Sequence, residues 1–210
     1  MTGMSLQNVT FPVQMEFRLS VRTEIRVTDA HGQLLAVVKE KLFSVRDEVR
    51  IYADEAKRQQ LYSIKAKGFL AGAMDWKAQR LIVAENGRPV GALGSQGVRT
   101  LWGAAYDLTD GQGQARYTIR DDKPWMSLVE NAVDAIPFVG NFLALGFDYL
   151  VNPTYTVRDT AGTEVARISK NRSLLSRRFT VQELRPIAGP DAELLLTGLI
   201  QLVLRERDRG

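Results

Sequence analysis

The stretch that decides the fold is residues 194–204, close to the C-terminus, which read LLLTGLIQLVL. As a helix it is apolar on nearly every side, so in a globular chain it must be buried all round. A proline and acidic residues at 190–193 and arginines at 205–209 match the charge preferences of helix starts and ends. The stretch would extend only about 17 Å, whereas a bilayer core is about 30 Å thick. We therefore predict a buried helix over residues 191–205 and no transmembrane span.

Short β-prone runs separated by turn residues occupy the chain from about residue 13 to residue 120 and again before the final helix. In each, an apolar strand is followed by a turn that contains an aspartate or asparagine and a glycine, and then by a second strand. This order is typical of an antiparallel hairpin. Sequential hairpins that close on themselves would surround the final helix with apolar neighbours. The sequence thus predicts a mainly β domain with some α, a closed antiparallel barrel enclosing the C-terminal helix. The hairpins read IRVTDAHGQLLAVVK (25–39), LIVAENGRPVGAL (81–93), YDLTDGQGQARYTI (106–119) and YTVRDTAGTEVARI (155–168).

Residues 124–151 break this β pattern. Met126, Val129, Val133 and Ile136 stand at helical spacing before a break at 137–140. We predict a short helical insert over 124–151 within a single domain that spans residues 1–210. Its aromatic side chains would either pack over a barrel end, which we favour, or form a surface for a protein partner.

The composition bounds the functions that are open to the chain. Its 210 residues include no cysteine, which excludes disulfides and thiolate chemistry and fits a reducing compartment, so we expect a cytoplasmic protein. The 28 basic and 24 acidic residues give a net charge of +4, spread along the chain. This modest surplus favours a solvated mixed-charge surface over a surface for nucleic acid or anionic lipid.

No catalytic or metal-binding constellation stands out, so we predict a protein without catalytic residues, metal or cofactor. The single histidine, His31, falls inside a predicted turn. Asp107 and Asp110 near two glycines lack the ligand spacing of a calcium loop and fit a hairpin turn better. Asp47 and Glu48 are adjacent and would point to opposite faces of a strand, so we interpret them as solvated turn charges.

Two segments carry a family resemblance: IRVTDAHGQLLAVVKEKLFSVRDEVRIYADEAKRQQLYSIKAKG (25–68), and YTVRDTAGTEVARISKNRSLLSRRFTVQEL (155–184) before the apolar helix. Together they resemble the tubby C-terminal-like barrels, specifically the LURP-one-related and phospholipid-scramblase branch. The resemblance implies a twelve-stranded barrel around the final helix and a mainly non-enzymatic family whose tubby members bind phosphoinositide headgroups through basic residues. The cysteine-rich palmitoylated stretch of the scramblases is absent, so lipid anchoring does not carry over.

The basic residues that could form an anion site are pairs at period two, on one face of a strand, and a group near the last hairpin. Their ordinary role would be to keep the outer face of a barrel soluble and to guard sheet edges. Our leading hypothesis is a non-catalytic module that binds an anionic phospholipid headgroup, peripheral to a membrane, or a protein partner through 124–151. The alternatives are an enzyme with a carboxylate-based pocket at a barrel end and a purely structural interaction domain. The candidate ligand-binding residues are Lys39, Lys41, Lys65, Lys67, Arg172, Arg177 and Arg178.

Overall fold

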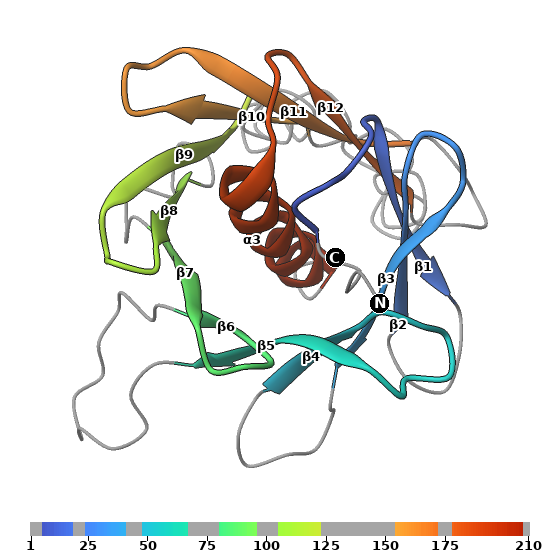
Figure 1. The fold of residues 1–210 in the computed structure, drawn as a ribbon. Coiled ribbons are helices and arrows are strands. Elements are labelled where there is room, and N and C mark those ends of the chain that lie inside the picture. The colour runs from blue at the N-terminus through green and yellow to red at the C-terminus, as the bar shows by residue number, and fades with distance from the viewer. Residues whose placement is uncertain are drawn as a thin grey trace, which may run out of the picture.

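The protein folds as a closed antiparallel barrel of twelve strands around one C-terminal helix, which confirms the predicted fold class (Figure 1). The computed structural model describes residues 6–18, 24–40, 48–66, 80–95, 105–122, 154–171 and 178–207, so the predicted insert at 124–151 lies outside the described residues. Each strand pairs with its neighbours in sequence, and β1 closes the barrel against β12. The elements are β1 (Val13–Arg18), β2 (Glu24–Thr28), β3 (Leu34–Glu40), β4 (Glu48–Tyr52), β5 (Gln60–Ala66), β6 (Arg80–Ala84), β7 (Pro89–Ser95), β8 (Ala105–Asp110), β9 (Ala115–Asp121), β10 (Thr154–Asp159), β11 (Glu164–Lys170), β12 (Arg178–Glu183) and α3 (Gly189–Arg207).

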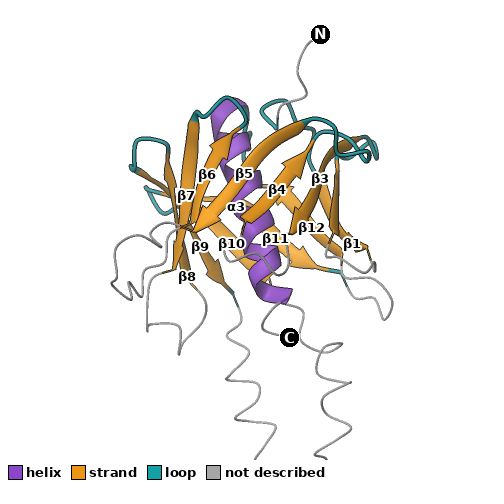
Figure 2. Ribbon diagram, turned by 90° about the horizontal axis from the view of Figure 1, so that it is seen from below, coloured by secondary structure: helices purple, strands orange, loops and turns teal. Residues whose placement is uncertain are grey.

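The two ends of the barrel differ in their connections. The short turns that join β2 to β3, β4 to β5, β6 to β7, β8 to β9 and β10 to β11 all lie at one end, which we call the turn end (Figure 2). The helix α3 starts at the turn end and runs through the barrel toward the opposite end, which we call the far end. The odd-numbered strands finish at the far end and the even-numbered strands begin there, because the strands alternate in direction.

Three of the turns at the turn end are built in the same way. The carboxylates of Asp29, Asp110 and Asp159 each accept hydrogen bonds from two backbone N–H groups, two and four residues later, at 2.8–2.9 Å. The glycine three residues after each aspartate has a positive φ, which only glycine adopts without strain. This geometry confirms the predicted hairpins and accounts for the repeated acid-to-glycine spacing. The glycines are Gly32 (φ 77°), Gly113 (φ 82°) and Gly162 (φ 82°).

Inside the barrel, α3 packs most closely against β7 and β8. A Cβ atom added at Gly91 would lie 2.4 Å from Leu194 Cδ1, and one at Gly198 would lie 2.7 Å from Leu108 Cδ1. Both approaches are too close for any larger residue, so these two glycines allow the helix to contact this wall of the barrel. Although residues 194–204 of α3 are nearly all apolar, no helix in the described part of the chain has the length and apolar character to cross a bilayer.

One side of the buried helix α3 carries a stripe of polar residues, although most of its buried residues are apolar. Glu193, Thr197 and Gln201 follow one another at four-residue intervals and are 1%, 0% and 0% exposed. Thr197 Oγ1 donates to the backbone oxygen of Glu193 at 2.8 Å. Glu193 Oε1 accepts from Arg88 Nη2 at 2.7 Å and Oε2 from Gln7 Nε2 at 3.0 Å. These contacts fix the start of the helix to the β6–β7 turn and to the N-terminal segment.

Candidate functional site

Three of the seven basic residues predicted for the anion site are described, and all three lie on the outer wall near the far end. Lys39 and Lys65 are the next-to-last residues of β3 and β5, and Arg178 is the first residue of β12. Each stands next to a buried, inward-facing residue, so alternation along the strand directs its own side chain outward. The other four lie outside the described residues: Lys41, Lys67, Arg172 and Arg177.

Lys39 and Lys65 belong to a group of charges that we call the β3–β5 patch, formed by Lys39, Glu48, Arg50 and Lys65. Lys39 lies opposite Arg50 in the β3–β4 pairing, and Glu48 lies opposite Lys65 in the β4–β5 pairing. Arg50 donates to Glu48 Oε2 from Nη2 at 3.0 Å and from Nε at 3.2 Å, while Lys65 Nζ is 3.7 Å from Glu48 Oε1. Two cations therefore share one carboxylate, and Lys39 adds a further positive charge. These four residues carry a net charge of +2, and on the other side of Lys39 the carboxylate of Glu24 lies opposite it in the β2–β3 pairing.

The electrostatics of the patch depend on Glu48. Hydrogen bonds to Glu48 and then to Tyr52 raise the pKa of Arg50 above its ordinary value. Glu48 is the first residue of β4 and its side chain is 19% exposed, so it is a strand residue and not the solvated turn charge that we expected. The reason is that β4 begins at this residue, which directs its carboxylate to the same outer face as Arg50.

Apolar surface extends the patch on β6. Leu81 lies opposite Lys65 in the β5–β6 pairing and is 38% exposed. Among the described residues, the other exposed large hydrophobic side chain is that of Leu184, which is 44% exposed and follows β12. An exposed leucine thus stands directly beside the cations of the patch.

Arg178 is placed apart from the patch. It lies opposite Glu16 in the β1–β12 pairing and donates to Glu16 Oε1 at 2.8 Å. The strands β1 and β2 separate it from β3. The structure therefore brings Lys39 and Lys65 together around β4, and does not bring Arg178 to them.

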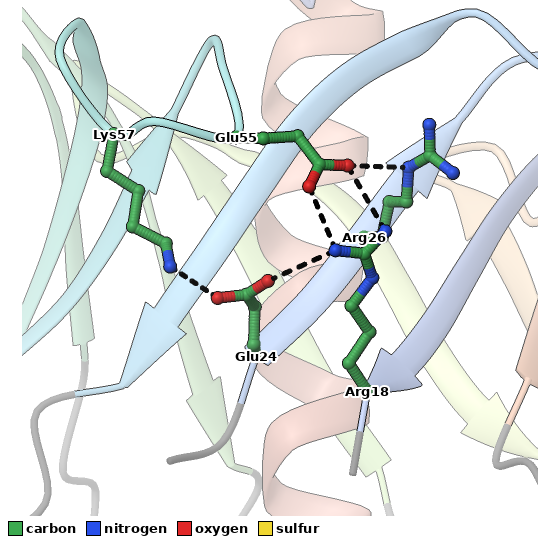
Figure 3. Close-up of polar contacts among 5 residues, drawn as sticks. All are labelled: Arg18, Glu24, Arg26, Glu55 and Lys57. Carbon is green, nitrogen blue, oxygen red and sulfur yellow. Dashed lines mark hydrogen bonds and ion pairs between the residues drawn. The ribbon is translucent and has the colours of Figure 1, made fainter. Parts of the chain in front are cut away.

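A second group of charges lies beside the patch on β1, β2 and the β4–β5 turn, and we call it the turn cluster (Figure 3). Arg18 donates to Glu55 Oε2 from Nη1 at 2.9 Å and to Oε1 from Nη2 at 3.2 Å. Arg26 Nε is 3.2 Å from Glu55 Oε1, and Lys57 donates to Glu24. Glu55 reaches across β3 to meet arginines from two other strands.

The carboxylate and phenol groups described at the turn end are engaged or protonated. Both oxygens of Glu193 are engaged, by Arg88 and Gln7. Burial and then the negative charge of Asp191 raise the pKa of Tyr117 to about 12, so this phenol remains protonated at neutral pH. Within the described ranges, no group of three or more histidine, aspartate or glutamate side chains has an arrangement that could hold a metal ion.

Comparisons with known proteins support the fold and leave the family open. No protein-family model matches the chain, and no curated protein matches it. A crystal structure of a protein from Arabidopsis thaliana is similar to this chain, with a TM-score of 0.52 and 11% sequence identity. The alignment covers 96% of this chain and 94% of the Arabidopsis chain, so the likeness extends over the entire barrel and its helix.

Proposed function

We propose that this protein is a non-catalytic binding module of the cytoplasm that docks on anionic membrane surfaces through the β3–β5 patch. The observation that carries the proposal is the placement of three cations on adjacent strands, with Arg50 and Lys65 sharing the carboxylate of Glu48 and Lys39 opposite Arg50. The likeness to tubby C-terminal-like barrels supports it, because that resemblance implies headgroup binding by basic residues of the barrel wall.

Convergence matters because isolated surface charges contribute little. An ion pair made by exposed cations is worth about 0–1 kcal/mol, so Arg50 and Lys65 can exchange Glu48 for a phosphate at little cost. Several cations that face one anionic surface add about 1 kcal/mol each. The side chains of Arg50 and Lys65 are 43% and 60% exposed, so both can reach a surface without refolding.

Leu81 favours a membrane over a nucleic acid as the anionic surface. An apolar side chain beside cations is typical of proteins that lie in the headgroup region, where the leucine enters the acyl boundary and the cations meet phosphates. The alternative of an enzyme would need unengaged ionisable groups in a pocket, and the carboxylate of Glu193 is not of that kind.

The first test removes two cations of the patch. We expect Lys39→Gln combined with Arg50→Gln to weaken binding to vesicles that contain phosphatidylserine or phosphoinositide by about 2 kcal/mol, or roughly thirtyfold. Binding of the unmodified protein should also fall steeply between low and physiological salt, where the screening length is ~8 Å. Co-sedimentation with these vesicles and with neutral phosphatidylcholine vesicles measures both effects.

The matched control lies on the opposite wall of the barrel. Arg158 and Arg167 share Glu164 there, at 2.8 and 3.3 Å, as Arg50 and Lys65 share Glu48. Arg158→Gln with Arg167→Gln removes the same charge and should leave binding nearly unchanged. An equal loss in both double variants would show that only the net charge matters and would contradict the proposal.

The second test concerns the leucine beside the patch. We expect Leu81→Ser to weaken vesicle binding about five- to thirtyfold, because burying a leucine side chain in an apolar medium contributes about 1–2 kcal/mol when insertion is partial. Leu184→Ser, at the more exposed leucine outside the patch, should have no effect. Dissociation constants from vesicle titration would distinguish the two, and equal effects would exclude a role for Leu81.

A further inference from the structure

The side chain of Glu55, in the β4–β5 turn, extends across the outer face of β3 to reach Arg18 of β1 and Arg26 of β2 (Figure 3). The shape of this turn is fixed by Asp54, whose Oδ2 accepts backbone hydrogen bonds from Arg58 at 3.2 Å and Gln59 at 3.1 Å. Val37 of β3 lies opposite Arg26 and so faces outward, yet it is only 1% exposed. The outer face of β3 is therefore covered at Val37.

Arg18 and Arg26 contact the carboxylate of Glu55 in the way that arginines bind an anionic ligand. Arg18 uses two parallel N–H groups, one to each oxygen of Glu55. This bidentate geometry is the one by which arginine recognises carboxylates and phosphates alike. Arg18 and Arg26 are diagonal neighbours on adjacent antiparallel strands, since Arg18 lies opposite Glu24 and Arg26 lies opposite Glu16.

Arg26 is left with an unsatisfied donor in this arrangement. Its Nε atom is buried and, within the described residues, makes no hydrogen bond of acceptable geometry, although it lies 3.2 Å from Glu55 Oε1. Both Glu55 oxygens already accept from Arg18. Each carboxylate oxygen has a second acceptor position, but Glu55 Oε1 does not lie in line with the Arg26 Nε–H, whereas the third oxygen of a phosphate group could.

We propose that Arg18 and Arg26 form a binding site for a phosphomonoester anion, and that Glu55 occupies this site as an intramolecular substitute. The phosphate would take the two Arg18 contacts and place a third oxygen toward Arg26 Nε. The side chain of Glu55 would then turn away from the two arginines, while Lys57 of the same turn keeps its contact with Glu24. The site differs from the β3–β5 patch in its residues and does not depend on it.

The charges around the site permit this exchange. The side chains of Arg18, Arg26 and Glu55 are 43%, 37% and 45% exposed, so water already reaches the ion pairs. Glu24 lies 3.8 Å from Arg18 and would repel a phosphate, but Lys57 binds Glu24 from the same turn. Two arginines facing one phosphate dianion balance its charge.

The direct test is the affinity for inorganic pyrophosphate, measured by isothermal titration calorimetry in the intact protein. We expect Glu55→Gln to increase the affinity about three- to tenfold, because exposed ion pairs of this kind hold the competing carboxylate only weakly. Adding Arg18→Gln to Glu55→Gln should abolish the gain. Acetate should bind the Glu55→Gln variant far more weakly than pyrophosphate does, because it lacks the third oxygen.

Glu164→Gln is the matched control, since Glu164 also bridges two arginines and its loss changes the net charge equally. An equal gain in this variant, no gain with Glu55→Gln, or a gain that survives Arg18→Gln would overturn the proposal. Thermal melts verify that each variant is folded.

Vesicles of phosphatidylcholine with phosphatidic acid or with phosphatidylserine distinguish a lipid source from a free one, because only phosphatidic acid has a phosphomonoester. Preference of Glu55→Gln for phosphatidic acid would assign the site to lipid. Pyrophosphate binding without that preference would assign it to a soluble phosphate. The calorimetric titration contains no membrane, so its result is independent of the membrane docking proposed for the β3–β5 patch.

Discussion

Replacing Leu199 with aspartate is expected to unfold the protein at ambient temperature. Leu199 is 0% exposed at the centre of α3, where the barrel interior offers an ionised carboxylate no water. An unpaired buried charge costs several kcal/mol, on the order of the 5–15 kcal/mol that stabilises a typical domain. Urea denaturation followed by circular dichroism would report the loss.

The control for this substitution is another leucine. Leu184→Asp introduces the same charge at a side chain that is 44% exposed, and we expect it to change the free energy of unfolding by less than about 0.5 kcal/mol. If Leu199→Asp retained the denaturation midpoint of the unmodified protein, the enclosed helix would not be the centre of this fold.

A second large effect is expected at the turn end, where Arg88 neutralises a buried carboxylate. The side chain of Glu193 is 2% exposed and that of Arg88 is 45% exposed, with 2.7 Å between Oε1 and Nη2. Arg88→Gln would leave the charge of Glu193 buried and opposed only by the Gln7 amide. Breaking a buried pair in this way costs about 3–5 kcal/mol, so the urea midpoint should fall substantially.

Two further variants make this prediction specific. Arg116→Gln breaks the neighbouring pair with Asp191, whose side chain is 40% exposed, and should cost less than about 1 kcal/mol. Combining Arg88→Gln with Glu193→Gln removes both charges and should recover much of the lost stability. A double variant no more stable than Arg88→Gln alone would show that the ion pair is not the source of the effect.

The barrel and its helix could be predicted from the sequence because both rest on local patterns. A helix that is apolar all round requires a complete enclosure, and repeated turns with an aspartate followed by glycine require hairpins. Asp29, Asp110 and Asp159 satisfy that rule with the same hydrogen bonds. The buried polar stripe was not predicted, because Glu193 is compatible with burial only through Arg88, which lies 105 residues away.

The candidate site was predicted only in part, because it depends on strand register. Lys39 and Lys65 were identified from their period of two along separate strands. Arg50 was missed, although it stands between them on β4, since only the cross-strand pairing shows that it faces Lys39. If consecutive strands are placed side by side and their side chains are alternated between the two faces, Arg50 falls on the outer face between Lys39 and Lys65.

The turn cluster lies beyond what a single sequence reveals. Glu55 and Arg18 are 37 residues apart and meet because the β4–β5 turn bends so that the Glu55 side chain extends over the outside of β3. That bend involves a left-handed backbone at Lys57, with φ of 57°, where the sequence has no glycine to signal it. Contacts of this kind arise from the path of a turn and have no periodic signature.

The most direct test of the proposed function uses the absence of cysteine in the chain, which permits a unique label at any introduced cysteine. An environment-sensitive NBD fluorophore at Leu81→Cys would report contact of the β3–β5 patch with a membrane, and the same label at Leu184→Cys would report a position outside the patch. On addition of vesicles with phosphatidylserine or phosphoinositide, we predict a blue shift and an intensity increase at residue 81 only. Equal changes at both residues, or a change only at residue 184, would contradict docking through the patch.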